Sequence, residues 1–338
     1  MTIRANANFQ SLTGTSPHQS DSHRYREYRR AWMENPAGFI LADFPLHLDV
    51  EASCRCNLRC VFCDKLPALK GLVQGDMDFG LWRTIIAEAG RNGLYGLKLS
   101  YRGEPLLHPR LPEMVAMAKD AGILDIYFNT NGMLLSQETA RALIDAKLDR
   151  ISVSVEGTDP AAFERARRGA DFARIEANIR GLVELRERLG AATPKVRVQT
   201  VRLPGLDLEA YAAYWGQRAD EVAVVDYKDG GNRVTGVEHA GFACPQPWQR
   251  MTITWDGLVL PCNNDDDLVM PLGRIPERSI GQCWSDARLM ELRGLHRRGL
   301  SHLAGPCDGC PWRTAQIAKL GKIEPSGTGR QAQGDPCD

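Results

Sequence analysis

The chain has 338 residues, of which 43% are hydrophobic, so it can bury the core of one large domain and of a smaller one. Its 42 Lys and Arg residues equal its 42 Asp and Glu residues, and this zero net charge argues against a general binder of nucleic acid. No apolar run approaches the length that spans a bilayer, and residues 1–21 lack the apolar core of an export signal. We therefore expect a cytoplasmic protein with no nucleic-acid or membrane partner.

The first predicted helix is a basic and aromatic segment, HRYREYRRAWMENP, at residues 23–36. Its simplest interpretation is a helix whose Tyr and Trp side chains pack on the domain that follows. The alternative is that its arginines bind phosphates of a substrate. We assign residues 1–44 to an N-terminal extension.

Six short, β-branched and apolar runs alternate with amphipathic segments in the middle of the chain. Asp159 and Asp207 are typical N-caps for two of the helices. Strands that alternate with helices form a parallel sheet, because right-handed crossovers place each helix on the outside. Six units are too few for a closed eight-stranded barrel, so the pattern predicts an α/β fold with a partial (β/α)6 barrel over residues 45–235. The runs lie at residues 45–53, 96–100, 124–130, 150–156, 195–201 and 221–227.

The ten cysteines are distributed unevenly, with four in residues 54–63, six in residues 244–338 and none between. In a reducing compartment such clustering indicates metal binding rather than disulfides. The first group directly follows the first predicted strand, at the end of parallel strands where α/β folds build their active sites.

Three cysteines of the first group have the spacing C-x3-C-x2-C, at Cys56, Cys60 and Cys63. Structural zinc needs four ligands, so a zinc site would have to borrow Cys54 or a distant residue. A four-iron cluster on three cysteines instead keeps one iron open to a further ligand. Cys54 itself is expected to be a small residue at the end of a strand.

Cys56, Cys60 and Cys63 resemble the signature of the radical S-adenosylmethionine (radical SAM) enzymes. The resemblance implies a [4Fe-4S] cluster whose open iron binds S-adenosylmethionine (SAM), and an external electron donor such as flavodoxin or ferredoxin. It further implies that SAM is cleaved to methionine and a 5′-deoxyadenosyl radical, which takes hydrogen from a substrate.

Residues downstream resemble the SAM-binding segments of the same family. RGEP at 102–105 is similar to the family's GGEP segment, although Arg102 replaces its first glycine. Two of these residues have simpler interpretations, since Arg167 could lie on a solvated helix face and Asn131 could cap a turn. The residues that the resemblance assigns to SAM are Phe62, Gly103, Glu104, Asn131, Ser154, Glu156 and Arg167.

Four C-terminal cysteines surround a predicted hairpin. The segments MTITW and LVLPC alternate around Asp256-Gly257, which predicts a two-residue turn. Cys244 precedes this hairpin, Cys262 closes it, and CDGC at 307–310 supplies two more thiols. From their spacing alone, four thiols could close a zinc site or ligate a cluster.

This second group resembles the SPASM and twitch extensions of radical SAM enzymes, which bind auxiliary [4Fe-4S] clusters, and an aminocyclitol dehydrogenase of the butirosin pathway has similar spacing. A full SPASM domain continues with further cysteines, whereas PWRTAQIAKLG after the last one has none. The resemblance implies one auxiliary cluster in a SPASM/twitch-like domain at 236–315, followed by a flexible tail at 316–338. Its ligands would be Cys244, Cys262, Cys307 and Cys310.

Two cysteines belong to neither group. Cys283 is expected to be a small buried residue at the start of a helix, and the alternative is a catalytic thiol that donates hydrogen to a substrate radical. Cys337 lies in the predicted tail and receives no role.

These features together predict a radical SAM enzyme of natural-product biosynthesis that acts on a sugar, nucleoside or aminocyclitol. Residues 23–53 resemble radical SAM proteins of bacterial sugar, polysaccharide and nucleoside pathways, including the tunicamycin pathway. Dehydrogenation, carbon–carbon coupling and epimerisation all remain possible outcomes. One alternative is a SPASM-type enzyme that modifies a ribosomal peptide, and another is a zinc-stabilised binding protein without catalytic activity.

Overall fold

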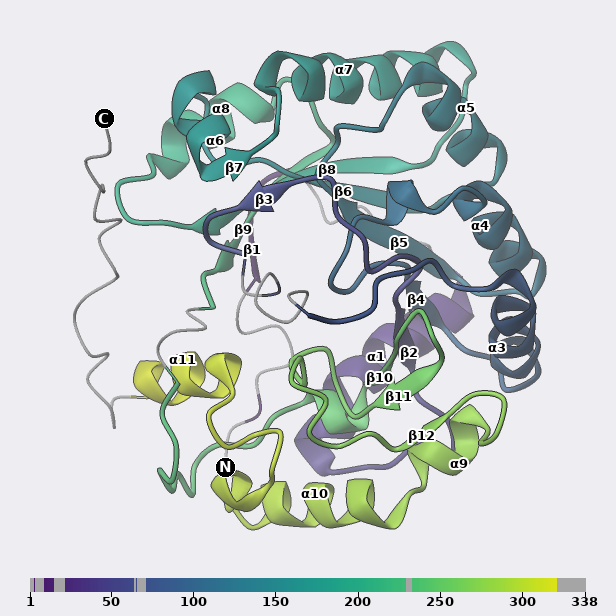
Figure 1. Cartoon of the computed structure of the whole chain (residues 1–338), viewed down its shortest axis with the longest axis vertical. Coiled ribbons are helices and arrows are strands. Elements are labelled where there is room, and N and C mark those ends of the chain that lie inside the picture. The colour runs from purple at the N-terminus through teal and green to yellow at the C-terminus, as the bar shows by residue number, and fades with distance from the viewer. Residues whose placement is uncertain are drawn as a thin grey trace.

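The core of the fold is a ten-stranded sheet that curves into an open barrel, with helices along its outer side (Figure 1). The strand order is β1-β9-β8-β6-β5-β4-β2-β10-β11-β12. The six strands from β9 to β2 in this order are each parallel to their neighbours within the set, which confirms the predicted partial (β/α)6 barrel. The computed structural model describes residues 3, 9–14, 22–63, 65, 71–228 and 233–320. Cys337 and most of the predicted tail lie outside these residues.

The six predicted strands are present, and helices cross over between them. The strands are β2 (His47–Val50), β4 (Gly96–Lys98), β5 (Asp125–Thr130), β6 (Arg150–Ser154), β8 (Lys195–Arg202) and β9 (Glu221–Asp226). The helices are α3 (Phe79–Arg91), α4 (Leu111–Asp120), α5 (Gln137–Asp145), α6 (Pro160–Ala166), α7 (Phe172–Arg188) and α8 (Leu208–Trp215). Asp159 and Asp207 cap α6 and α8 through their side chains, as predicted.

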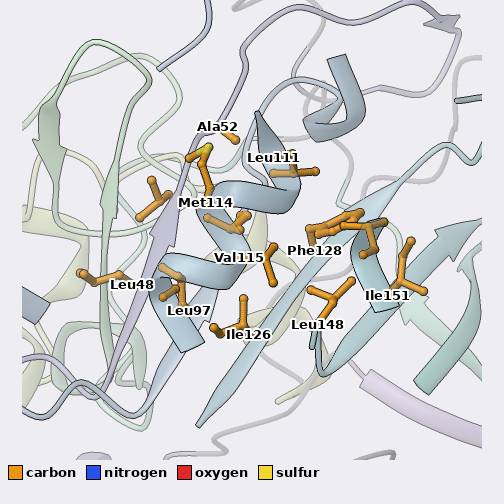
Figure 2. Close-up of a cluster of buried hydrophobic side chains, with 14 of the residues drawn as sticks. Leu48, Ala52, Leu97, Leu111, Met114, Val115, Ile126, Phe128, Leu148 and Ile151 are labelled. Atoms are coloured by element: carbon orange, nitrogen blue, oxygen red, sulfur yellow. The ribbon is translucent and has the colours of Figure 1, made fainter. Parts of the chain in front are cut away.

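The main core lies between the sheet and this outer layer of helices. Outward-facing strand residues such as Leu97, Ile126 and Ile151 are fully buried, and α4 covers them with Met114 and Val115 (Figure 2). Burial of such side chains is worth about 1.5–3 kcal/mol each, so this layer holds the barrel strands in register.

The C-terminal segment continues the same sheet. β10 (Arg250–Ile253) runs parallel to β2, and β11 (Leu258–Leu260) and β12 (Gly273–Arg274) follow in antiparallel order. The predicted hairpin is present, but the prediction that its turn has two residues is wrong. The amide of Thr254 donates to the carbonyl of Leu258, so residues 255–257 form a three-residue loop. Gly257 occupies the left-handed position (φ 86°) that such loops require.

The N-terminal extension closes the barrel where the parallel strands begin. β1 (Phe9–Thr13) pairs with β9, and α1 (His23–Gly38) crosses the strand starts with Tyr25, Tyr28 and Trp32 buried, which confirms that its aromatic side chains pack on the domain. The Tyr28 hydroxyl lies 3.3 Å from Nδ1 of His47 on β2.

The remaining helical elements are short, and α11 extends into the predicted tail. These elements are η1 (Pro105–Leu107), η2 (Gln246–Trp248), α9 (Ile280–Trp284), α10 (Ala287–Arg297), η3 (Ser301–Leu303) and α11 (Pro311–Lys319). In the described part of the chain, no helix has the length and apolar character to cross a bilayer.

Truncation of Leu97 to alanine should destabilise the protein by about 2–5 kcal/mol, because it leaves a cavity beneath α4. Anaerobic thermal unfolding followed by circular dichroism should then begin several degrees lower than in the wild type. The matched control is Leu189→Ala, whose side chain is 41% exposed and which should change stability by less than about 0.5 kcal/mol. Equal destabilisation by both substitutions would contradict this placement of the core.

Candidate active site

A two-stranded ladder pins the loop that carries the first cysteine group. β3 (Arg59–Cys60) pairs antiparallel with β7 (Arg167–Arg168), so that Cys60 lies opposite Arg167. The guanidinium of Arg167 reaches to 3.8 Å from the Cys60 sulfur. The loop after β2 is therefore fixed to the connection between α6 and α7, a pairing that periodicity did not predict.

The three thiols of this group influence one another. Burial raises the pKa of Cys60 to about 11, the positive charge of Arg167 lowers it, and the neighbouring Cys63 and Cys56 raise it further. Burial also raises the pKa of Cys56, with a contribution from Cys63. Cluster ligands bind as thiolates, so loading this site must release protons, and Arg167 supplies a compensating positive charge.

Arg167 forms an ion pair with Glu156 beside the cysteine loop. Its Nη2 donates to Glu156 at 2.8 Å, and its guanidinium lies 5.3 Å from the ring centre of Phe62. The helix α6 ends at Ala166, so Arg167 is buried rather than on a solvated helix face. Three residues assigned to SAM by resemblance thus meet next to Cys60.

The side chain of Glu104 connects the ends of two strands through hydrogen bonds. Its carboxylate accepts hydrogen bonds at 2.7 Å from the hydroxyl of Thr130 and from the amide of Asn131, and at 3.0 Å from the amide of Leu106. Burial raises its pKa, and these donors oppose the rise. The side chain therefore joins the loop after β4 to the end of β5.

Asn131 and Gly103 connect the strand ends joined by Glu104 to the cysteine loop. The Asn131 amide donates to Asn57 at 2.8 Å, while its carbonyl oxygen caps the turn at Met133. A Cβ atom on Gly103 would lie 2.3 Å from the carbonyl oxygen of Ser53, so only glycine fits there. Asn57, between two of the cysteines, was missed because an isolated asparagine in a loop carries no sequence signal.

Arg102 replaces a family glycine and is used inside the protein. Its side chain forms a two-point ion pair with Glu51, with both donor distances 2.9 Å, and both side chains are buried. The guanidinium of Arg102 is therefore held by Glu51 inside the protein. Ser154 ends β6, beside Gln199 of β8.

The second cysteine group forms a compact set near the C-terminus. Burial raises the pKa of all four thiols, to about 12 for Cys262, and each thiol's pKa also responds to the charge of others in the set or to nearby lysines. Phe242, Trp312 and Ile317 pack around Cys310 and Cys244 as a small separate core. Within the described residues, no three Cys, His, Asp or Glu side chains converge as closely as ligands of a single metal ion do.

A buried histidine contacts two members of this group and was not predicted from the sequence. His296 accepts the amide hydrogen of Cys244 at its Nδ1, at 3.1 Å, so its Nε2 carries the ring hydrogen. That Nε2 lies 3.3 Å from the Cys307 sulfur. Burial lowers the pKa of His296 to about 4, which keeps it a neutral donor to this sulfur near pH 7.

Cys283 lies apart from both groups. It is fully buried in α9, its sulfur is 3.8 Å from the carbonyl oxygen of Leu272, and burial raises its pKa to about 11. It does not line the cavity described below. This position matches the small buried residue that we expected and gives the thiol no path to a substrate there.

One cavity of about 530 Å³ extends through the barrel interior, where it reaches Cys60 and Cys63 of the first group and sequence neighbours of the second group. Cys60, Phe62 and Cys63 line it on one side, and Pro245 and Trp312, which flank the second group, line another. Of the residues assigned to SAM, Phe62 and Arg167 line the cavity, and the other five support the loops around it. A polar chamber thus lies between the two thiol sets.

The barrel interior is polar because the strands alternate in character. Inward-facing positions on β5 carry Asp125, Tyr127 and Asn129, and those on β8 include Arg197 and Gln199. Parallel strands buried on both faces are normally apolar throughout, so a strict alternation such as DIYFN signals a hydrophilic interior. This alternation in the sequence predicts a polar barrel interior.

Comparisons with known proteins agree with this geometry. A family model described as the radical SAM superfamily matches residues 50–202, and an iron-sulfur cluster-binding (SPASM) model matches residues 244–311. A PqqA peptide cyclase of Xanthomonas oryzae pv. oryzae is 26% identical over 310 residues, which cover 80% of this chain and 81% of that protein.

Two solved structures share the fold. One is BtrN in complex with AdoMet and 2-DOIA, with a TM-score of 0.51 and 21% identity over 75% of this chain and 87% of that chain. The other is SuiB of Streptococcus suis bound to precursor peptide SuiA, with a TM-score of 0.55 and 16% identity over 86% of this chain and 78% of that chain. The predicted resemblance is confirmed, including the cluster and SAM that these two domains imply.

The two thiol sets can be tested separately by metal content. Anaerobically reconstituted wild-type protein should carry about eight irons per chain, and Cys60→Ala or Cys262→Ala should each retain about four. Cys54→Ala is the matched control, because its thiol exchanges hydrogen bonds with the backbone of Val73 and Gly75, and it should keep all eight. Loss of iron from Cys54→Ala, or full iron in either ligand variant, would contradict the assignment.

Proposed function

Because this chain belongs to the radical SAM superfamily and carries a SPASM domain, we propose that it abstracts a hydrogen atom from a small hydroxylated molecule of the sugar, nucleoside or aminocyclitol class. The observation that carries this proposal is the polar cavity between the two cysteine groups. Its floor is closed by α1, which suits a compact substrate. As a member of this enzyme superfamily, the chain is not a zinc-stabilised binding protein.

Cys56, Cys60 and Cys63 would hold the cluster, which when bound would supply the electron for reductive cleavage of SAM to methionine and the 5′-deoxyadenosyl radical. Arg167 and Phe62 line the cavity beside these cysteines and are the candidate contacts for SAM. Glu104 and Asn131 would hold the loops in place rather than touch SAM, since their hydrogen bonds are made to the protein.

Dehydrogenation is the outcome that the cavity supports best. A carbinol carbon that has lost its hydrogen atom becomes a ketone when it gives up one proton and one electron. Asp226, at the end of β9, lines the cavity beside Lys319 and would accept the proton, and the cluster held by Cys244, Cys262, Cys307 and Cys310 would accept the electron. Epimerisation would need a donor thiol, and the described cavity lining contains only Cys60 and Cys63.

A ribosomal peptide is the second candidate substrate. The PqqA peptide cyclases, which match four-fifths of this chain, favour it. A peptide would have to enter from the cysteine side of the cavity, because α1 covers the opposite end. Carbon–carbon coupling would then replace dehydrogenation as the expected outcome.

The test is reductive cleavage of SAM by the reconstituted protein. With dithionite as the electron source, the wild type should release 5′-deoxyadenosine, and Cys60→Ala should release none. Candidate substrates deuterated at carbon then separate the two classes, since the true substrate transfers deuterium and raises the mass of 5′-deoxyadenosine by one unit. Zinc in place of iron, with no cleavage of SAM, would overturn the proposal. Deuterium transfer only from a peptide would move it to the second candidate.

A further inference from the structure

We propose that the end of the cavity at the starts of the parallel strands binds a phosphoryl group of the substrate, which makes the substrate a phosphate monoester or a diphosphate. This inference rests on the proposed function, because it assigns the same cavity to a substrate. It adds a chemical class and an orientation: the phosphoryl group lies on the floor, and the reacting carbon faces the cysteines.

Five cationic side chains line this floor. Asp125 and Arg150 are the first residues of β5 and β6, so they mark the end of the barrel opposite the cysteine loop. Burial, and then the positive charge of Arg150, lowers the pKa of Arg197, which shows that the cations lie near one another. The five cations are Arg29, Lys98, Arg150, Arg197 and Arg250.

Three of these cations are balanced by carboxylates on the barrel strands. Arg150 pairs with Asp125 at 3.1 Å and Arg197 pairs with Glu221 at 2.7 Å. Arg250 pairs with Asp49 at 3.3 Å. These pairs hold the guanidinium groups in fixed positions around the floor.

The other two cations have no carboxylate within ion-pair distance in the part of the chain that the structure describes. Arg29 extends from α1 over the rings of Tyr28 and Trp32, at 5.7 and 5.8 Å from their centres. Lys98 of β4 pairs in register with Tyr127 of β5, which in turn pairs with Arg150. Burial lowers the pKa of Lys98, and the negative charge of Asp49 opposes this shift. With Lys98 protonated, five cations against three carboxylates leave an excess of two positive charges, which equals the charge of a phosphate monoester dianion or of a diphosphate diester.

The floor also offers unused hydrogen-bond donors. The Nε atoms of Arg150 and Arg250 are buried and make no hydrogen bond in the described structure. A buried N–H group without a partner has lost its hydrogen bonds to water, so an acceptor at this floor would be favourable. The guanidinium of Arg150 lies 3.9 Å from the ring centre of Tyr127, which keeps its planar donor edge oriented.

Phosphoryl oxygens match these features better than a carboxylate does. A phosphoryl group presents three acceptor oxygens and up to two charges, and arginine binds it through paired donors. A single carboxylate would neutralise only half of the excess charge. An acidic peptide is therefore the competing ligand that an experiment must exclude.

The experiment is anaerobic calorimetric titration of the reconstituted protein, loaded with SAM, with pyrophosphate and with inorganic phosphate. Tighter binding of pyrophosphate would indicate a diphosphate substrate, and tighter binding of phosphate a monoester. Arg29→Gln should weaken the preferred anion by about tenfold or more, and Arg29→Lys should restore part of the affinity. The matched control is Arg30→Gln, the next residue of α1, whose side chain is 68% exposed and which should bind as the wild type does.

Equal anion affinity in Arg29→Gln and the wild type would overturn the inference. So would wild-type protein that binds an Asp- and Glu-rich peptide but neither inorganic anion. Iron content of each variant checks that it is folded. Because no SAM cleavage is required, anion binding that depends on Arg29 in a protein without 5′-deoxyadenosine formation would reject the proposed function and leave this site standing.

Discussion

The structure depends on the alternation of apolar and polar residues along its parallel strands. In β2 the outward-facing Leu48 and Val50 pack in the helix-covered core, whereas the inward-facing Asp49 is charged. The outer helices stabilise the barrel by burying the apolar face. The inner face is consequently free to remain hydrophilic, and a chamber replaces the packed centre that an apolar interior would form.

Such a polar interior is stable only because its charges are distributed over neighbouring strands. Ion pairs such as Arg197 with Glu221 and Arg102 with Glu51 lie on or beside the strands and contribute fixed local fields. Each buried charge left alone would cost several kcal/mol, so pairing is a condition of the architecture. The unpaired Arg29 and Lys98 depart from this rule, and residues that depart from it are where a ligand is expected.

The fold and the family could be predicted from the sequence because they rest on local signals. Strand runs, the caps Asp159 and Asp207, and the spacing of the cysteines each follow from neighbouring residues. The β3–β7 ladder and the contact of His296 with Cys307 depend on packing between distant segments. The hairpin turn was misjudged by one residue for a similar reason: a Cβ atom on Gly257 would lie 2.7 Å from the carbonyl oxygen of Ile275, so the course of the loop depends on the residue that follows β12.

The central claim is that the barrel interior is a substrate chamber between two iron-sulfur clusters. Its most direct test is a crystal structure of the anaerobically reconstituted protein with SAM, with diffraction measured on both sides of the iron absorption edge. We expect two iron peaks, one beside Cys60 and one beside Cys262, with the cavity between them. SAM should extend into the cavity from the iron peak beside Cys60. A single iron peak, or zinc at either position, would contradict it.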